Sequence, residues 1–370
     1  MGQDSKNRLI KGGKMFVGIP REKKNHEYRV GGLPETVSIL REKGHRVLVE
    51  SGAGQGIGLQ DRDYSDAGAE ICSSPEDIYS KCQLVVKVKE PLPEEYPMLR
   101  EEQIIFTFFH FASDRKMTEI LLSKKVHCFA YELVEEEGAF PILAPMSEIA
   151  GRLAPQQGAK YIEKEFGGKG VLLSGGLGAR KGRVVVIGGG IVGMNAASIS
   201  CGMGAEVSIL EISPARIEYL ENLFKGTCRI LQANRENKEN EIRRADIIIG
   251  AVMIPGKKAP TVIGKEDLLK IEDGSVLVDV AIDQGGCFET SRPTNHNQPI
   301  FTLEGVIHYC VPNMPGVVPR TSTYSLVAAA TPYTIMLADK GIDAPKNNMP
   351  LSRGYAIGNG KILNSNIITQ

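Results

Sequence analysis

The sequence predicts an α/β protein with two doubly wound, Rossmann-like domains joined by two long helices. Short apolar runs alternate with amphipathic, helix-like segments along most of the 370 residues. This alternation is typical of a parallel sheet with helices on both faces. A chain of this length is too long for one ordinary hydrophobic core, so two domains are expected.

The first part of the chain repeats the order strand, helix, strand. Pro34–Lys43 is one predicted helix, and Gly44 directly after it is a suitable residue for ending a helix. The same apolar spacing predicts the other elements. Strands are expected at Met15–Pro20, Arg46–Glu50, Leu84–Val88 and Ile104–Phe108, and helices at Glu76–Lys81 and Lys116–Lys124.

The second part begins with a long helix-like segment from Ser147 to about Phe166. The strand expected after it, Arg183–Ile187, has no polar residue beyond its first position, as in a strand covered on both faces. A second long helix is predicted at Ser325–Asp339, and the tail beyond Gly341 is expected to pack on the first domain. Further strands are predicted at Glu206–Leu210, Ile247–Ala251, Ser275–Val280 and Ile307–Cys310.

These elements predict a discontinuous first domain, residues 15–142 plus 322–370, and a second domain, residues 143–321. Residues 1–14 are polar and basic and lack the apolar core of a signal peptide, so we expect a disordered leader. No stretch reaches the roughly 18 apolar residues of a membrane helix. The sequence therefore predicts a protein without a membrane segment.

Composition argues against several classes of partner. Lys+Arg and Asp+Glu both total 44, and a balanced charge does not favour nucleic-acid binding. The seven cysteines are scattered and form no CxxC pair, which argues against a zinc site and a disulfide framework. Reduced thiols in the cytoplasm, with no metal, are the expectation.

The motif Gly188-Gly189-Gly190-Ile191-Val192-Gly193 directly follows an apolar strand and opens a helix-like segment. In this context Gly188 permits a tight turn, Gly190 lets the backbone approach a pyrophosphate, and Gly193 allows close helix–strand packing. The helix N-terminus then faces the phosphate charge. The second domain is therefore predicted to bind a dinucleotide; the alternative is a glycine-rich turn without a ligand.

Glu211 stands at the end of the next predicted strand, eighteen residues after Gly193. A carboxylate there accepts hydrogen bonds from both ribose hydroxyls and repels a 2′-phosphate, which favours NAD over NADP. The alternative is a solvated glutamate. The loop after Ile247–Ala251, residues 252–256, is expected to line the cofactor crevice.

A dehydrogenase for an amino or keto acid needs a cation for the carboxylate, a donor to the reacting carbonyl or imine, and a group that moves protons. Four candidates each follow a predicted strand: Arg29, Lys89, His110 and Asp283. A guanidinium suits bidentate carboxylate binding, and an imidazole titrates near neutral pH.

Each candidate also has an ordinary structural interpretation. Arg29 can be solvated, and His110 can be a hydrogen-bonded core residue. Lys89 can be a solvated strand terminus, and strand parity places Lys87 on the same face. Asp283, which precedes Gly285-Gly286, can be a turn former. Their shared position after strands favours the catalytic interpretation.

Several blocks resemble the alanine dehydrogenase family, which is related to the NAD(H)-binding subunit of proton-translocating transhydrogenase. The resemblance extends from Met15 to about Gly341. Its blocks are Gly18-Ile19-Pro20-Arg21-Glu22, Glu27-Tyr28-Arg29-Val30, Lys87-Val88-Lys89-Glu90-Pro91, Phe106-Thr107-Phe108-Phe109-His110, Leu143-Ala144-Pro145-Met146-Ser147-Glu148, Ala150-Gly151-Arg152-Leu153, the glycine motif, Ala281-Ile282-Asp283-Gln284-Gly285-Gly286, Asn313-Met314-Pro315-Gly316 and Thr321-Ser322-Thr323-Tyr324.

The resemblance implies NAD-dependent conversion of L-alanine to pyruvate and ammonium, and the reverse, between the two domains. Arg29 and Lys89 are then the groups that hold the substrate carboxylate, and His110 and Asp283 are the catalytic pair. The resemblance also implies that Met146, Ser147 and Asn313 line the junction of substrate and nicotinamide, with Met146 and Asn313 on the substrate and Ser147 on the cofactor. Members of the family commonly form hexamers, so a homo-oligomer is expected.

Two departures from the family pattern leave alternatives open. The run Gly31-Gly32-Leu33-Pro34 replaces the usual sequence after the arginine, and Glu211 replaces the more usual aspartate. The first departure keeps a dehydrogenase for another small substrate in view, such as glycine/glyoxylate or an N-alkyl amino acid. A transhydrogenase-like NAD(H) module without amino-acid turnover is a second alternative, and a non-enzymatic binding protein a third.

Overall fold

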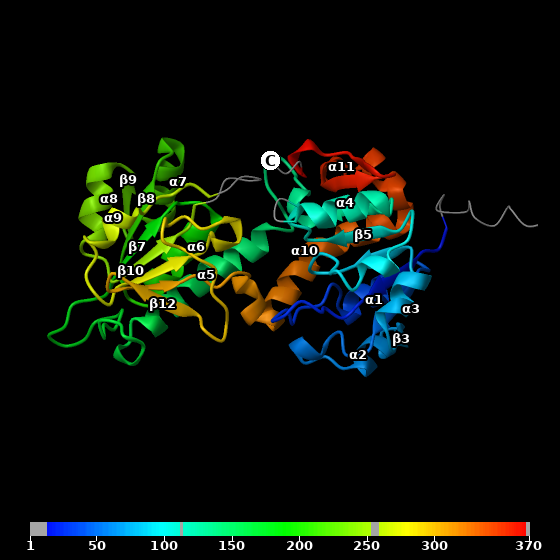
Figure 1. Cartoon of the computed structure of the whole chain (residues 1–370), viewed down its shortest axis with the longest axis horizontal. Helices are drawn as coiled ribbons and strands as arrows, with labels where there is room; N and C mark the ends of the chain where they lie inside the picture. Colours follow the sequence, from blue (N-terminus) through cyan, green and yellow to red (C-terminus); the bar gives the residue numbers. More distant parts are fainter. Residues whose placement is uncertain (1–12, 112–113, 253–258, 368–370) are drawn as a thin grey trace, which may run out of the picture. The chain divides into compact units, whose positions relative to one another are not determined.

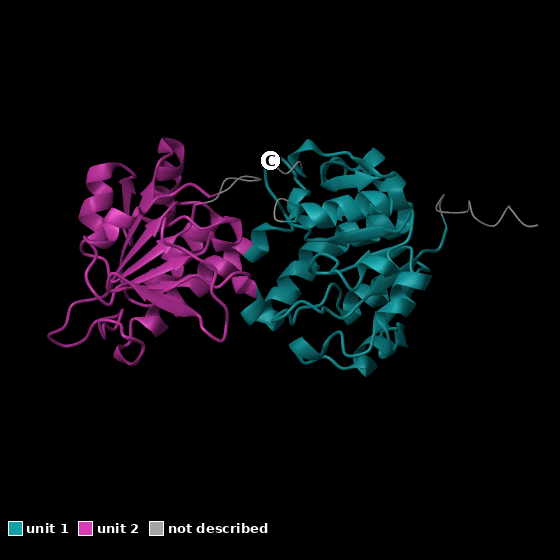
Figure 2. Ribbon diagram, in the orientation of Figure 1, with its two compact units in different colours: residues 1–146, 316–370 teal, residues 147–315 magenta. Residues whose placement is uncertain are grey.

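The computed structural model describes residues 13–111, 114–252 and 259–367. The chain divides into two compact units, shown in two colours in Figure 2. Unit 1 consists of residues 1–146 and 316–370, and unit 2 of residues 147–315. The chain therefore leaves unit 1 once and returns to it.

Unit 1 contains an eight-stranded sheet with the order β15-β14-β6-β5-β4-β1-β2-β3. The six strands from the N-terminal segment are parallel, whereas β14 pairs antiparallel with β6 and β15 antiparallel with β14. Two strands of the C-terminal tail thus complete the sheet of unit 1. The strands are β1 Phe16–Ile19, β2 Arg46–Glu50, β3 Glu70–Cys72, β4 Leu84–Val86, β5 Ile104–Thr107, β6 His127–Ala130, β14 Tyr355–Gly358 and β15 Lys361–Ile362.

The helices of unit 1 begin at residues suited to that position. Ser74 and Asp114 accept backbone N–H groups of α3 and α4 with their side chains, which satisfies donors that a helix start leaves open. A buried cluster that includes Val85, Ile105 and Phe109 forms part of the core. The helices are α1 Pro34–Glu42, α2 Asp61–Asp66, α3 Pro75–Lys81, α4 Arg115–Ser123, α10 Pro319–Lys340 and α11 Met349–Gly354 (Figure 1).

Unit 2 contains a seven-stranded sheet with the order β12-β13-β11-β10-β7-β8-β9. All pairs are parallel except β12 with β13. The first strand, β7, lies between the second and the fourth, so the strand order reverses there, as in a dinucleotide-binding fold. The strands are β7 Arg183–Ile187, β8 Glu206–Glu211, β9 Arg229–Gln232, β10 Ile247–Gly250, β11 Val276–Asp279, β12 Ile300–Leu303 and β13 Val306–Tyr309.

One helix of unit 2, α5, passes close to the helix that follows the glycine motif. A Cβ at Gly151 in α5 would lie 2.3 Å from the backbone oxygen of Val192 in α6, so only glycine permits this approach. The helices are α6 Ile191–Gly202, α7 Pro214–Phe224, α8 Arg235–Ile242, α9 Lys265–Leu268 and, apart from its first residues, α5 Ala144–Tyr161. Short 3₁₀ turns used below are η4 Tyr131–Leu133 and η6 Ile282–Gln284.

The predicted α/β class with two Rossmann-like domains is confirmed, but several details were wrong. β12 pairs antiparallel with β13, and β14 pairs antiparallel with both β6 and β15, so neither sheet is purely parallel. The first long helix ends at Tyr161 instead of Phe166, because Glu163 has an extended backbone and a separate 3₁₀ turn follows. The second long helix starts at Pro319, where proline suits the first helical turn. Within the described ranges, no helix is both long and apolar enough to cross a membrane.

Candidate active site

The glycine motif in unit 2 forms the turn between β7 and α6. Gly188 has φ +98°, a left-handed conformation that favours glycine. A Cβ at Gly193 would lie 1.8 Å from the oxygen of Gly188, so any side chain would open the turn. At Gly190 no atom lies within 4 Å of the Cβ position, and no side chain caps the helix there. The open approach and the uncapped helix start fit a bound pyrophosphate.

Glu211 at the end of β8 is directed at this turn. One carboxylate oxygen accepts the Gly189 N–H at 2.7 Å, and the other accepts the N–H groups of Ile212 and Ser213 at 2.7 and 2.9 Å. The solvated-glutamate alternative therefore does not apply, because this carboxylate is held beside the turn. The glycine motif and Glu211 together fit the dinucleotide NAD.

Two further elements were expected to contact the cofactor, Ser147 and the loop of residues 252–256. Ser147 is partly buried in the first turn of α5. The loop expected at residues 252–256 begins at Val252, which packs against the core of unit 2. Residues 253–256 of that loop lie outside the described part of the chain.

Arg29 follows β1 in unit 1 and is almost completely buried. Its Nε and Nη2 donate to the two carboxylate oxygens of Glu27 at 2.7 and 2.5 Å. Its Nη1 donates to the sulfur of Met146 at 3.2 Å, which brings these two predicted substrate residues together. The interpretation of Arg29 as a solvated surface residue is thus wrong.

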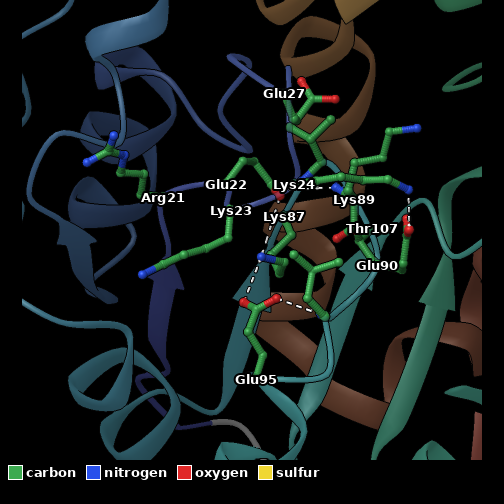
Figure 3. A network of polar contacts seen from close by, with 12 residues as sticks. Arg21, Glu22, Lys23, Lys24, Glu27, Lys87, Lys89, Glu90, Glu95 and Thr107 are labelled. Carbon is green, nitrogen blue, oxygen red and sulfur yellow. Dashed lines mark hydrogen bonds and ion pairs between the residues drawn. The ribbon is translucent and has the colours of Figure 1, made fainter. Parts of the chain in front are cut away.

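Lys87 and Lys89 follow β4 but have different environments. Because β4 ends at Val86, strand parity does not extend to these residues. Lys87 is fully buried and forms ion pairs with Glu95 at 2.9 Å and Glu22 at 3.5 Å (Figure 3). The Nζ of Lys89 instead lies 3.5 Å from Nε2 of His110. Lys89 is therefore the lysine that faces the other site residues.

Glu22 holds the segment that carries Lys89. Its Oε1 accepts the N–H groups of Val88 at 2.6 Å and Lys89 at 3.3 Å, and its Oε2 faces the ammonium of Lys87. Thr107 donates its hydroxyl to the Lys89 carbonyl at 2.9 Å from β5. Burial raises the pKa of Glu22 to about 6, although the charge of Lys87 and the Val88 N–H lower it.

His110 follows β5 with a backbone φ of +52°. Its ring stacks on Phe108 with 5.7 Å between the ring centroids. Part of the residue is open to solvent, but the surrounding protein and the cations of Lys89, Lys24 and Arg29 lower the pKa of the imidazole well below its usual value. The ring is therefore neutral at neutral pH, and it is not an ordinary core histidine.

Asp283 and Asn313 come together in unit 2. Asp283 lies exposed in η6, just after β11, and Asn313 follows β13, the neighbour of β11 in the sheet. The backbone N–H of Asn313 donates to both oxygens of Asp283, at 3.2 and 3.0 Å. The carboxylate of Asp279 at the end of β11 instead binds the turn through the N–H groups of Ala281 and Cys287.

The topology explains why the residues of unit 1 converge. The strands β6, β5, β4 and β1 are adjacent and parallel, so their carboxyl ends lie at one edge of the sheet. Arg29, Lys89 and His110 follow three of these strands. Sequence reasoning gave no role to three carboxylates at the same edge, Glu22, Glu27 and Glu132. Within the described residues, no group of three or more His, Cys, Asp or Glu side chains is arranged to bind a metal ion.

Comparisons with known proteins identify the family of this chain. Residues 18–150 match the family model "Alanine dehydrogenase/PNT, N-terminal domain", and residues 154–365 match "Alanine dehydrogenase/PNT, C-terminal domain". An alanine dehydrogenase of Staphylococcus epidermidis is 48% identical over 95% of this chain and 96% of its own length. Alanine dehydrogenase 2 of Staphylococcus aureus is 46% identical over 95% of both chains.

Solved structures give the same result. A structure of L-alanine dehydrogenase superposes with a TM-score of 0.92 at 44% identity, covering 95% of this chain and 98% of that one. A transhydrogenase from Sinorhizobium meliloti shares the fold, with a TM-score of 0.82 at 21% identity over 94% of this chain and 99% of that one. The chain belongs to the alanine dehydrogenase/PNT family.

Proposed function

We propose that this chain is an NAD-dependent alanine dehydrogenase, which oxidises L-alanine to pyruvate and ammonia and catalyses the reverse reductive amination. One observation carries this function: the Lys89 ammonium lies 3.5 Å from the His110 imidazole, close to the buried Arg29. Two cations and a neutral imidazole at one sheet edge suit an amino or keto acid. A protein that only binds a nucleotide has no need of them in unit 1.

Arg29 and Lys89 hold the substrate carboxylate in this proposal. Glu27 accepts hydrogen bonds from Nε and Nη2 of the guanidinium, and we assign Nη1, which reaches Met146, as a donor to the substrate. In the structure Nη1 contacts the thioether of Met146, which is a weak acceptor that a carboxylate readily replaces. Lys89 adds a second charge, and Met146 stays in contact with the bound substrate.

His110 and Asp283 move the protons. Because the imidazole of His110 is neutral at neutral pH, it accepts a proton as water adds to the imine carbon of the oxidised substrate. Asp283, held by the Asn313 N–H, orients the attacking water. In the reverse reaction the same two groups return the protons, and Asn313 contacts the substrate.

NAD supplies the acceptor for the hydride that leaves the substrate Cα. Gly188, Gly190 and Gly193 form the turn that binds its pyrophosphate. The carboxylate of Glu211 accepts hydrogen bonds from the hydroxyls of the adenosine ribose. To do so, Glu211 shares the oxygen that now accepts the Gly189 N–H. Ser147 is the remaining proposed contact to the cofactor.

The departure at Gly31-Gly32 does not favour another substrate. A Cβ at Gly31 would lie 2.6 Å from the Val86 oxygen, and one at Gly32 would lie 2.6 Å from Ile19. Both glycines are thus explained by packing within unit 1. The departure therefore gives no reason to prefer glycine/glyoxylate or an N-alkyl amino acid over L-alanine.

An initial-rate assay tests the function. Wild-type protein with NAD is expected to form NADH with L-alanine, and to oxidise NADH with pyruvate and ammonium. Glycine, glyoxylate and an N-methyl amino acid in parallel reactions separate the other dehydrogenases. NADH binding without any amino-acid turnover would instead identify the transhydrogenase-like module.

We also propose a homo-oligomer, a hexamer by resemblance to the family, that works in the cytoplasm. All seven cysteines are thiols in the structure, which suits a reducing compartment. Light scattering after size-exclusion chromatography gives the mass to compare with the 40.2 kDa chain. A single-chain mass would rule the oligomer out.

A further inference from the structure

Glu132 lies in η4, directly after β6, and β6 is the neighbour of β5 in the sheet of unit 1. Its Oε1 accepts the backbone N–H of His110 at 2.6 Å and that of Phe109 at 3.1 Å. Its Oε2 lies 3.3 Å from the same Phe109 N–H. The carboxylate of Glu132 therefore binds the backbone of Phe109 and of His110, the residue that carries the imidazole.

These hydrogen bonds stabilise an unusual backbone conformation. His110 has φ +52°, a left-handed conformation that is energetically unfavourable for a residue with a Cβ. A charge-assisted bond from a backbone N–H to a carboxylate contributes a stabilising energy that offsets this cost. The carboxylate of Glu132 is therefore suited to keep the turn at His110 in this conformation.

The backbone conformation in turn fixes the ring. With the turn as observed, the imidazole stacks on Phe108 at an interplanar angle of 11°, and its Nε2 faces the Lys89 ammonium. Rotation of the His110 backbone would move the ring away from both neighbours. Glu132 acts on the ring through the backbone, since its carboxylate accepts the N–H groups of Phe109 and His110.

The charges around Glu132 make it sensitive to pH. Lys89 faces it from the segment after β4, and Lys24 and Arg29 face the neighbouring His110 from the segment after β1. Burial raises the pKa of Glu132 to about 7, partly offset by its own N–H, those of His110 and Phe109, and the charge of Lys89. Protonation would leave a weaker acceptor at the turn.

We propose that Glu132 is a positioning residue for His110: its ionised carboxylate holds the Phe109–His110 turn, and thereby the imidazole, where proton transfer occurs. Glu132 does not touch the substrate. This inference rests on the proposed alanine dehydrogenase function and deepens it. Glu132 thereby acquires a role that no sequence pattern assigned to it.

The test uses the full chain and three variants: Glu132→Gln, Glu132→Ala and the control Glu135→Gln. Glu135 lies three residues further on and pairs with Arg353 at the surface. For L-alanine oxidation, Glu132→Ala is expected to lose about 10- to 100-fold in kcat. The dissociation constant for NADH and the KM for L-alanine should change little. Glu132→Gln should retain part of kcat, because its amide oxygen still accepts one N–H, and Glu135→Gln should resemble wild type.

The pH dependence separates positioning from a general structural defect. Above about pH 7 the wild-type carboxylate is ionised and the ratio of wild-type to Glu132→Gln kcat is expected to be large. Below that pH the protonated acid resembles the amide, so the ratio should approach one. A ratio that is constant between about pH 6 and about pH 9 would overturn the proposal. So would wild-type kcat in Glu132→Ala.

The design also separates this inference from the proposed function. If wild-type protein does not oxidise L-alanine, the function itself fails. If wild type is active and the Glu132 variants match it, only the positioning role fails. Should Glu132→Ala not fold, the pH profile of the near-isosteric Glu132→Gln decides the question.

Discussion

The Nζ of Lys89 lies 3.5 Å from Nε2 of His110, although the two residues follow different strands. A permanent positive charge at this distance opposes protonation of the imidazole. Burial of the ring is the larger cause, and together with this charge it holds the pKa of His110 well below that of an ordinary histidine. The relationship prepares His110 to accept a proton at neutral pH, and several measurements test it.

Removal of the lysine charge should raise the pKa of His110. In Lys89→Gln the imidazole loses one of the cations that oppose its protonation, whereas burial and Arg29 remain. We expect the His110 Cε1 resonance, identified by its absence in His110→Ala, to titrate at a higher pH than in wild type. An unchanged or lower titration pH would contradict the electrostatic coupling.

Replacement of Arg29 should weaken substrate binding more than turnover. Arg29→Ala removes the donor proposed for the carboxylate, and loss of such a bond should raise the KM for pyruvate about 10- to 100-fold. Arg29→Lys keeps the charge but not the planar guanidinium, so its KM for pyruvate should lie between those of wild type and Arg29→Ala. Because Arg29 also neutralises the buried Glu27, thermal stability should be measured in parallel. A folded Arg29→Ala with an unchanged KM for pyruvate would refute the role.

The glycine turn offers a matched pair of variants within one helix. In Gly193→Ala the new Cβ would overlap the Gly188 oxygen, so the turn should open and NADH binding should weaken by at least tenfold. In Gly202→Ala no atom lies within 4 Å of the new Cβ, and NADH binding should remain. The fluorescence of NADH, or calorimetry, measures both dissociation constants. Equal affinities in the two variants would argue against a pyrophosphate at this turn.

Glu22 predicts a pH-dependent contribution to stability. Its pKa in the folded protein, about 6, is above the ordinary value of 4.5, so between these values the folded state binds more protons than the unfolded state. The contribution of Glu22 to the free energy of unfolding is therefore largest below about pH 4.5 and is lost as the pH rises to about 6, by about 2 kcal/mol at most. The free energy of unfolding of wild type minus that of Glu22→Gln should therefore decrease as the pH rises over this interval. An increase would contradict a raised pKa of Glu22 in the folded protein.

The sequence predicted the parts of the fold that local patterns encode. The strand Arg183–Ile187 and its glycine turn were recognisable because an apolar run and fixed glycine spacing are local features. Strands such as β3 Glu70–Cys72, with two exposed residues, and β9 Arg229–Gln232 carry little apolar signal and were missed. The pairing of β14 with β6 joins segments that lie far apart in the chain, and no local pattern specifies it.

The site residues likewise divide into those that local sequence features indicate and those that depend on distant contacts. Arg29, Lys89 and His110 could be selected because their residue types and strand-end positions suit carboxylate binding and proton transfer. The residue pattern alone left Lys87 and Lys89 as alternatives, and only the family resemblance favoured Lys89, since the distinction depends on where β4 ends and on the distant partner Glu95. Glu132 was missed because β6 was not predicted, so its position at the same sheet edge was not apparent.

The most direct test of the central claim is the initial rate of NADH formation from L-alanine and NAD by wild type and by His110→Ala. We expect wild type to be active and His110→Ala to lose about 100-fold or more in kcat while it still binds NADH. Equal rates in the two proteins, or no alanine-dependent NADH formation by wild type, would contradict the account.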